Sequence, residues 1–339
     1  MKNLKKLPLI FTILSLVSFI TPVNAEVKVV TSIKPLHSLA SYLMDGVGKP
    51  DLIVDGYASP HGFSMKPSHA KMLQDADLIF WVGEDLENFL EKPLNSIAKK
   101  AEKIELMDIK GLNVLSFRER NIFDEHDDHD DHEGHAKKKK DDHDDHDDYD
   151  GHAKKKKDEH DDHDDHEEHG HGEYDPHIWL DPINAKVILK EMTEHLIEND
   201  SKNTSTYKSN LDKALKDIDK LTMNVMTELN QSVSSIVFHD AYQYFEQRFE
   251  VTSAGALTLN PDVLPGAKQI VDIQNLIKKK NIKCIFSEPQ YNPKIIETLA
   301  NDTNTSTGIM DPLGAYMDKG PSMYSKLIIG IADSIKNCI

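Results

Sequence analysis

The sequence predicts an α/β protein of two lobes with central sheets, joined by a long rigid backbone helix. Short β-branched or apolar runs alternate with helical patterns toward both ends of the chain, as in α/β folds. Residues 201–232 contain neither glycine nor proline, and their apolar side chains recur at spacings of three and four. Without residues 1–25 and 124–173, about 265 residues remain, which is enough for two domains of ordinary size.

The first lobe is expected to cover residues 26–200. Its β-branched run at 27–33 predicts a strand, and Pro35 leads from that strand into a helical pattern that continues to Leu43. The other elements predicted before residue 124 are a strand at 51–54, a helix at 67–74, a strand at 78–82, a helix at 86–100 and a short strand at 104–106. Near the end of the lobe, Asp181-Pro182 favours the start of a helix over 183–198, because proline suits the first helical turn.

Residues 201–232 are expected to form the linking helix, about 30 residues and roughly 45 Å long. Two lobes joined by such a stiff element should close little on binding, whereas a flexible hinge would show glycine or serine in place of this run. The second lobe covers residues 233–339. Its predicted elements are strands at 235–238, at 283–286 and near 308, and helices through 244, over 266–280, over 293–300 and from 322 onward.

Residues 1–25 have the pattern of a secretory signal peptide. Three lysines precede an apolar stretch at 7–20, and Val23-Asn24-Ala25 provides a small-residue cleavage site. A permanent membrane anchor is the alternative, but the apolar stretch is too short to span a bilayer comfortably. The residue directly after the predicted cleavage site is Glu26 and not cysteine, which excludes lipid anchoring at a new N-terminal cysteine. We therefore expect a soluble protein of the periplasm that begins near Glu26.

Residues 124–173 form a His/Asp-rich tract with 12 of the chain's 18 histidines. The tract repeats with a period of 17 residues and carries 23 acidic side chains against 8 lysines. Imidazole binds Zn²⁺, Cu²⁺ and Ni²⁺, so the tract predicts loose multivalent metal capture, with a solvated acidic linker as the alternative. It has almost no apolar side chain to offset the entropy of ordering, and we expect it to be a disordered loop. Its histidines are His126, His129, His132, His135, His143, His146, His152, His160, His163, His166, His169 and His171.

Cys284 and Cys338 are the two cysteines of the chain. In an exported protein an even pair indicates a disulfide, which here would connect an internal strand to the C-terminal segment. A cysteine-ligated metal site is the alternative, but the neighbouring residues lack ligand spacing.

Four metal-ligand residues outside the tract lie at or just beyond predicted strands, or lead an apolar segment. His61 follows the strand at 51–54, His177 precedes Ile178-Trp179, His239 directly follows the strand at 235–238, and Asp311 follows the strand near 308. α/β proteins place their sites at such strand ends. Three imidazoles with a carboxylate or water make a four-coordinate site that suits Zn²⁺ better than Mn²⁺. Taken singly, each histidine is more often structural, so the prediction depends on the set.

These segments together resemble the periplasmic zinc-binding component of the bacterial high-affinity zinc ABC importer, a cluster A-I binding protein. The resemblance covers essentially the whole mature chain. Its motifs are Ala58-Ser59-Pro60-His61, Met65-Lys66-Pro67-Ser68, Ala76-Asp77-Leu78-Ile79-Phe80-Trp81-Val82-Gly83, Asp175-Pro176-His177-Ile178-Trp179-Leu180-Asp181-Pro182, Phe238-His239-Asp240-Ala241-Tyr242, Cys284-Ile285-Phe286-Ser287-Glu288-Pro289-Gln290 and Asp311-Pro312-Leu313-Gly314.

The resemblance implies that zinc is held between two lobes by His61, His177 and His239. It also implies the Cys284–Cys338 disulfide and a charged His-rich loop between the first two ligand segments. The fourth ligand stays open. Some zinc-binding members have an acidic residue where this chain has Pro60, and Asp311 matches a ligand of manganese relatives, so either Asp311 or water completes the site.

These features predict a binding protein that captures Zn²⁺ with high affinity and delivers it to the membrane permease of a zinc ABC transporter, with the tract gathering or sensing extra zinc. Zn²⁺ is then the transported ligand and the protein is not an enzyme. A zinc-dependent hydrolase is the main alternative, although His-Glu-x-x-His and Gly-x-Ser-x-Gly are lacking. A periplasmic metal buffer or chaperone acting through the tract is another. We expect a monomer, and this acidic chain has no basic footprint for nucleic acid.

The remaining conspicuous residues are expected to be structural. His37 should be a surface or capping histidine, with a secondary metal site formed together with the tract as the alternative. His69 and His195 should be exposed on helices. Glu288 is expected to support the site or the fold without ligating metal.

Overall fold

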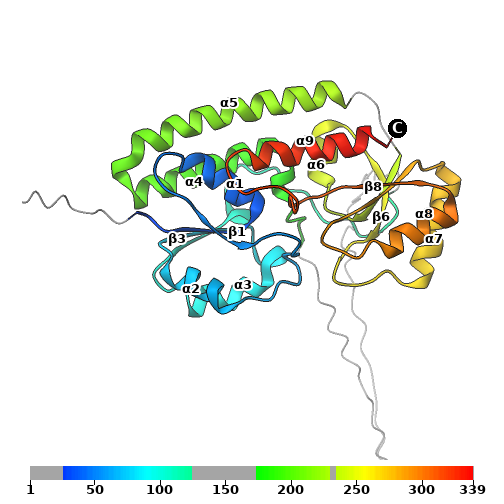
Figure 1. Ribbon diagram of the computed structural model, residues 1–339, viewed down its shortest axis with the longest axis horizontal. Coiled ribbons are helices and arrows are strands. Elements are labelled where there is room, and N and C mark those ends of the chain that lie inside the picture. The colour runs from blue at the N-terminus through cyan, green and yellow to red at the C-terminus, as the bar shows by residue number, and fades with distance from the viewer. Residues whose placement is uncertain (1–25, 124–172, 230–233, 339) are drawn as a thin grey trace, which may run out of the picture.

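The computed structural model describes residues 26–123, 173–229 and 234–338 (Figure 1). The predicted leader and the twelve histidines of the tract lie outside the described residues. Two separate parallel sheets of four strands each are present among those described, which confirms the predicted α/β class. None of the described helices is both long and apolar enough to cross a membrane.

The first sheet has the strand order β2-β1-β3-β4. Its central strand β1 is buried along its whole length, as expected of a parallel strand with both faces covered. The strands are β1 (Val29–Ile33), β2 (Asp51–Val54), β3 (Leu78–Trp81) and β4 (Glu102–Glu105), and the helices between them are α1 (Lys34–Leu43), α2 (Pro67–Asp75) and α3 (Glu84–Ser96). The sequence predicted each of these elements, with boundaries that differ by a few residues.

The second sheet repeats the arrangement with the strand order β6-β5-β7-β8. Its strands are β5 (Ser235–His239), β6 (Ser253–Thr258), β7 (Cys284–Ser287) and β8 (Ser306–Ile309), and its helices are α6 (Gln243–Phe249), α7 (Ala267–Lys280) and α8 (Lys294–Thr303). The sequence analysis missed β6, because most of its side chains are small and it lacks a β-branched run.

A strap from the first lobe lies against β6. We use the name crossing strap for residues 113–123, which begin beside Asn184 of the first lobe and end against the second sheet. The backbone NH of Ala256 donates to the carbonyl of Asn121 at 2.8 Å, and Ile122 forms an antiparallel bridge with Gly255. A Cβ at Gly255 would lie 2.4 Å from the Asn121 carbonyl oxygen, so glycine permits this close approach.

The backbone helix is α5 (Thr204–Glu228), which follows α4 (Pro182–Asn199). In Figure 1 it runs along one side of the molecule and packs on α1, α4 and the C-terminal helix α9 (Met323–Lys336). Its start differs from the prediction, because residues Ser201–Asn203 form a separate 3-10 turn. Asp200 holds this turn by accepting hydrogen bonds from Asn203 and from the Tyr207 hydroxyl. Residues 230–233 lie outside the described part of the chain.

The C-terminal helix α9 returns to the first lobe. It packs on α1 and α5, and the backbone NH of Tyr324 donates to the Ser38 hydroxyl of α1. The buried Lys34 ammonium donates to the carbonyls of Gly314 and Met317 in the segment before α9. The final segment therefore connects the lobes a second time, whereas the sequence placed all of residues 233–339 in the second lobe.

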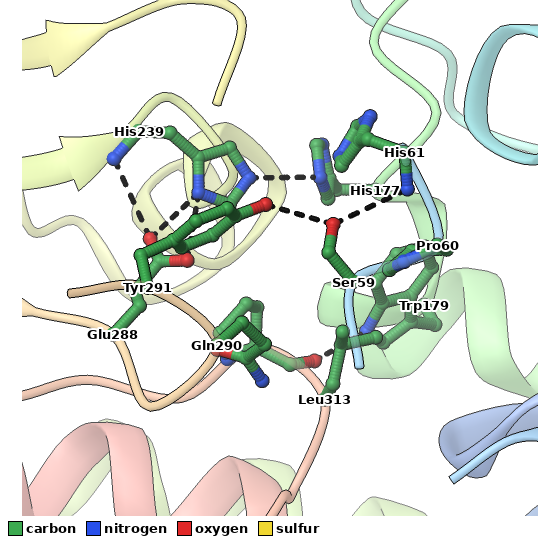
Figure 2. A pocket seen from close by; sticks show the side chains of 11 residues that line it. Ser59, Pro60, His61, His177, Trp179, His239, Glu288, Gln290, Tyr291 and Leu313 are labelled. Carbon is green, nitrogen blue, oxygen red and sulfur yellow. Dashed lines mark hydrogen bonds and ion pairs between the residues drawn. The ribbon is translucent and has the colours of Figure 1, made fainter. Parts of the chain in front are cut away.

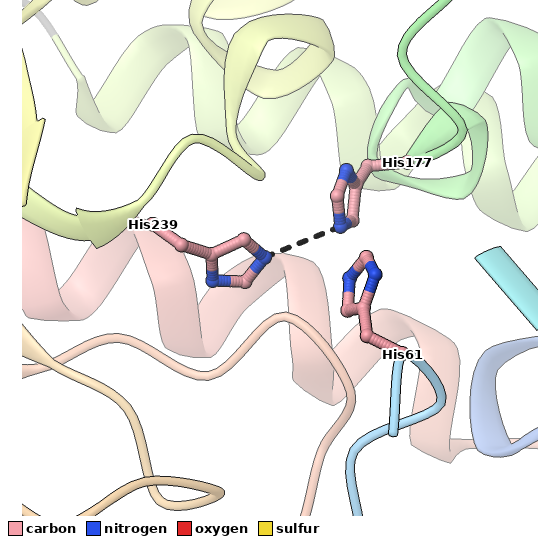
Figure 3. A group of neighbouring side chains, drawn as sticks. All are labelled: His61, His177 and His239. Atoms are coloured by element: carbon pink, nitrogen blue, oxygen red, sulfur yellow. Dashed lines mark hydrogen bonds between the residues drawn. The ribbon is translucent and has the colours of Figure 1, made fainter. Parts of the chain in front are cut away.

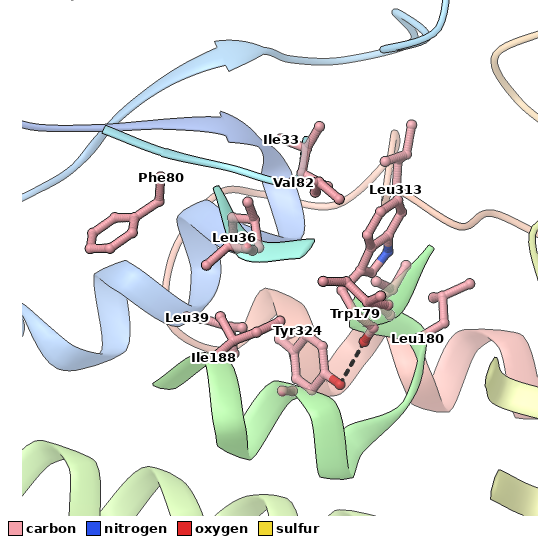
Figure 4. Close-up of a cluster of buried hydrophobic side chains, with 14 of the residues drawn as sticks. Ile33, Leu36, Leu39, Phe80, Val82, Trp179, Leu180, Ile188, Leu313 and Tyr324 are labelled. Carbon is pink, nitrogen blue, oxygen red and sulfur yellow. Dashed lines mark hydrogen bonds between the residues drawn. The ribbon is translucent and has the colours of Figure 1, made fainter. Parts of the chain in front are cut away.

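One hydrophobic core extends from the first sheet through α4, α5 and α9. Figure 4 shows Trp179 within it, between the first lobe and the segment that carries Leu313. The indole NH of Trp179 donates to the Pro312 carbonyl at 2.8 Å, and the Tyr324 hydroxyl donates to the Trp179 carbonyl. The core thus fixes the position of the segment that carries His177.

Candidate metal centre

Three histidines from separate segments meet between the lobes. His61 lies in the loop after β2, His177 immediately precedes a short 3-10 turn, and His239 is the last residue of β5. Their ring centroids lie 5.2 to 5.7 Å apart, and Nε2 of His177 is 3.3 Å from Nε2 of His239 (Figure 3). One nitrogen from each ring can be chosen so that all three lie within 4.8 Å of one another. This is the spacing from which one cation can bind all three imidazoles.

The histidines line a small pocket between the lobes, shown in Figure 2. Ser59 and Tyr291 close one side, because their hydroxyl oxygens lie 2.8 Å apart across the two lobes. The Ser59 hydroxyl also accepts a hydrogen bond from the backbone NH of His61. The other lining residues are Pro60, Trp179, Glu288, Gln290, Pro312 and Leu313.

A carboxylate orients each of the two buried histidines. Asp175 lies 2.7 Å from Nδ1 of His177 and also accepts the backbone NH of that residue. Glu288 lies 2.7 Å from Nδ1 of His239. With Nδ1–H donated to these acids, both Nε2 lone pairs point to the space between the rings. Glu288 is thus a supporting acid, as expected, and two buried acids stand ready to balance the charge of a dication.

The surroundings shift the pKa of each of these groups. Burial lowers the pKa of His177 well below its ordinary value, and the charge of His239 lowers it further. Burial also lowers the pKa of His239, but the charge and hydrogen bond of Glu288 outweigh it, so that the pKa is raised. Burial raises the pKa of Asp175 to about 7 against the opposing effect of the His177 backbone NH. Burial thus favours the neutral imidazole of His177, which is the form that can bind a metal ion.

A second set of charges ties the crossing strap to the site. Arg118 donates to Asp240 at 2.7 Å and to Glu246 at 2.8 Å, and its guanidinium lies 4.0 Å from the ring centroid of Phe123. Asp240 directly follows His239 and is almost wholly buried. Burial raises its pKa to about 7, although Arg118 acts in the opposite direction.

Asp311 does not join the three histidines in the described structure. Its carboxylate accepts hydrogen bonds from the backbone NH groups of Leu313, Gly314 and Ala315 and from the Gln290 side chain. It therefore holds the turn that follows β8. The group of potential ligands that the described residues form here contains the histidines alone.

Asp262 is an acid near the site that the sequence analysis missed. Its carboxylate lies 3.0 Å from where a Cβ at Gly62 would be, beside His61. Burial raises its pKa, and the charge of His239 acts against that rise. In the sequence, the sole indication that Asp262 lies near the site is its position in the loop after β6. The sequence pattern did not predict β6.

The other histidines differ from expectation. His37 is buried, with Nε2 3.1 Å from the Pro50 carbonyl, so the predicted surface position is wrong. His69 is partly exposed, and its Nδ1 accepts the backbone NH of Lys66 as a helix cap. The His195 side chain is only 18% exposed and is surrounded by glutamates, because β4 packs beside the end of α4.

Cys284 and Cys338 are joined in a disulfide with a Cα–Cα distance of 5.9 Å. The bond connects β7 to the end of α9. It therefore fixes the helix that returns to the first lobe, at its C-terminal end, to the second sheet.

A family model described as "Zinc-uptake complex component A periplasmic" matches residues 29–338. A relative from Brucella abortus (strain 2308), named "High-affinity zinc uptake system protein ZnuA", is 44% identical over 313 residues, which cover 92% of this chain and 91% of that protein. A protein of the same name from Haemophilus ducreyi is 38% identical over 339 residues, with 97% of this chain and 98% of that protein covered.

Solved structures share the fold at low sequence identity. The structure described as "138-173 ZnuA deletion mutant plus zinc bound" superimposes with a TM-score of 0.69 at 19% identity and covers 93% of this chain and 98% of that one. A manganese-bound periplasmic metal-binding protein from Candidatus Liberibacter asiaticus gives a TM-score of 0.66 at 18% identity, with 92% and 100% covered.

Proposed function

The chain belongs to the family of periplasmic zinc-uptake components A, and from this premise we propose that it binds Zn²⁺ between its lobes and delivers it to the membrane permease of an ABC importer. The ligands are His61, His177 and His239. The observation that carries the proposal is the convergence of one nitrogen from each of these rings within 4.8 Å.

The donor set favours zinc. Three imidazole nitrogens suit Zn²⁺, whereas Mn²⁺ prefers more oxygen ligands. The relatives from Brucella abortus and Haemophilus ducreyi are also named for zinc uptake. Asp175 and Glu288 would balance the double charge from outside the ligand shell, as carboxylates behind metal-bound histidines commonly do. Asp311 is engaged with backbone NH groups, so we assign the fourth position to water.

Transport without catalysis agrees best with the comparisons, because the relatives are named as uptake proteins. Release then requires that the permease separate the lobes. The contacts that this motion must break across the cleft include the hydroxyl pair of Ser59 and Tyr291. The connections through α5, α9 and the crossing strap restrict that motion, so opening should be small.

The leader and the tract complete the proposal. Residues 1–25 direct export to the periplasm, and the twelve histidines of the tract gather zinc beside the cleft at lower affinity. The two segments that flank the tract are fixed near the site. The crossing strap ends where the tract begins, and Asp175, which contacts His177, lies just after the tract.

Zinc titration of full-length variants against a chromophoric chelator tests the ligand assignment. His239→Ala should abolish the single tight equivalent, because two imidazoles do not form a closed zinc site. Glu288→Gln should weaken that equivalent about 10–100-fold, since the ligand His239 then loses its charged partner. The control His69→Gln should bind as the native chain does. Tight binding retained by His239→Ala would show that the ligands lie elsewhere.

A further inference from the structure

A second cluster of metal-ligand side chains lies on the first lobe, far from the cleft. It consists of Glu102 at the start of β4 and of His195 and Glu198 near the end of α4. Glu102 lies at the N-terminal end of a strand in the first sheet, whereas the cleft lies beyond the C-terminal ends of that sheet's strands. His195 is 14 residues along α4 from Asp181, which separates the cluster from the His177 segment by about 20 Å.

The ligand atoms already converge. Nδ1 of His195 lies 2.8 Å from Glu102 and 3.8 Å from Glu198, and one atom from each of the three residues lies within 4.8 Å of the others. Nδ1 is a buried atom that forms no hydrogen bond with any described residue, although Glu102 is so near. Nδ1 of His195 therefore faces the carboxylates of Glu102 and Glu198 without forming a hydrogen bond to either.

Neighbouring side chains hold two of the three ligands in place. Nε2 of His195 lies 3.3 Å from Glu191, one turn earlier on α4, so its N–H can be donated there. This arrangement leaves the Nδ1 lone pair free for a ligand. The Asn199 side-chain amide donates to Oε2 of Glu102 at 2.8 Å, and Oε1 of the same carboxylate faces His195. Both ligands thus have the outer contacts typical of metal-bound histidine and carboxylate.

The adjacent surface is negative. His195 and Glu191 line one end of a groove whose other charged residues are Glu84, Glu91, Lys103, Glu105, Asp108 and Lys110. Burial raises the pKa of Glu105, and the charge of Asp108 raises it further, as expected where acids crowd together. Such a groove attracts cations.

We propose that Glu102, His195 and Glu198 form a second site for a divalent transition metal of the Zn²⁺ class. Nδ1 of His195 and one oxygen from each glutamate are the ligands, and water completes the shell. Glu198 is 69% exposed, so this site is weaker than the cleft and exchanges its metal with solvent. A proton on Nδ1 of His195, in place of a metal ion, would also balance the negative charge of the two glutamates. The experiment below distinguishes a bound proton from a bound metal ion.

The test uses the full chain labelled with ¹⁵N in histidine, at neutral pH, with ZnCl₂ added beyond the tight equivalent. His195→Gln identifies the signal of His195 by its disappearance. In the native chain we expect the Nδ1 shift of that signal to move to that of a metal-bound nitrogen. Glu102→Gln should weaken the response at least tenfold, and Glu191→Gln, which changes the outer contact, about 10–100-fold. Glu194→Gln, on the same helix but outside the cluster, should respond as the native chain does.

Anomalous scattering at the zinc edge from soaked crystals should place a zinc ion at about 2.0–2.1 Å from Nδ1 of His195. A ring that stays protonated at neutral pH and does not respond to zinc overturns the proposal. So does a response equal in native chain and Glu102→Gln. These results are independent of the cleft, because zinc bound to His239 is observed separately.

Discussion

Glu87 is a fully buried carboxyl group whose ionisation should contribute to the pH dependence of stability, as should that of Asp175 and Asp240. Glu87 accepts hydrogen bonds from the backbone NH groups of Val82 and Gly83, but burial outweighs them and raises its pKa from 4.5 to about 7. A carboxyl group with a raised pKa favours folding while it is protonated. Its contribution is therefore complete below pH 4.5 and is lost as the pH rises toward 7, by about 3 kcal/mol.

Glu87→Gln should remove that loss. The amide oxygen can still accept the two NH groups, and no charge is buried. We expect urea denaturation with a chelator present to give a variant that is more stable than the native chain at pH 8, by about 3 kcal/mol, and similar to it at pH 4.5. Glu91→Gln, on the same helix, is the control. A constant difference between native chain and Glu87→Gln across this range would contradict the assignment.

The sequence predicts the three histidines of the candidate site but leaves the role of Asp311 open. His61, His177 and His239 each follow or precede an apolar segment, and sites of α/β proteins lie at strand ends, which predicts His61 and His239 as candidates. Their convergence from two separate sheets and a short 3-10 turn depends on how the lobes pack, which the sequence pattern does not predict. Asp311 occupies a similar place in sequence, but a turn of backbone NH groups takes its carboxylate. Such a capture depends on local backbone geometry, which periodicity does not reveal.

At the scale of elements, apolar periodicity was enough for every strand except β6. That strand is made of small residues because the crossing strap lies against it, so its composition reflects a tertiary neighbour and not strand propensity. The return of α9 to the first lobe was missed for a related reason. Its apolar residues predict a buried face, but they do not say which lobe buries it.

The contact between the crossing strap and β6 should tolerate no side chain at Gly255. Gly255→Ala places a methyl group 2.4 Å from a backbone oxygen, so the strap or the strand must shift and their hydrogen bonds weaken. We expect a loss of about 1–3 kcal/mol in the free energy of unfolding.

Gly330→Ala is the matched control. It lies within α9, and the nearest atom to its new methyl group is the flexible end of Met317. Alanine is favoured over glycine in a helix by about 1 kcal/mol, so this variant should be unchanged or more stable. Denaturant unfolding measures both. Equal effects from the two substitutions would mean that the strap is not packed as described.

For the whole molecule, the backbone helix α5, the returning helix α9 and the crossing strap hold the lobes together. The backbone helix α5 joins them along the chain, while α9 returns from the second lobe and is fixed to β7 by the disulfide. The lack of glycine and proline predicts the linking helix, whereas the sequence pattern predicts neither the return of α9 nor the crossing strap. These connections reduce the freedom of the cleft, so the fold itself holds the three histidines close together.

The anchoring of the segments on either side of the tract makes its removal a clean experiment. Ser116 pairs with Tyr174, and the Phe117 NH donates to the Glu173 carbonyl, so the two segments run side by side within a few residues of the tract. Residues 124–172 can therefore be replaced by about eight glycine and serine residues. This linker must reach from Phe123 back to Glu173, which lies beside Phe117, and its reach of roughly 26 Å exceeds the length of the six residues between Phe117 and Phe123. The cleft and its ligands need not move.

This replacement should leave the tight zinc equivalent intact and remove the weaker ones that the twelve histidines supply. Competition titration of native and shortened chains, with stoichiometry by metal analysis, measures both classes. The physical reason is that the three cleft imidazoles are held by Asp175, Glu288 and the sheets, which the tract does not form. A weak equivalent that survives the replacement should disappear with His195→Gln. Unchanged stoichiometry after replacement would show that the tract binds no zinc, and loss of the tight equivalent would place a ligand within it.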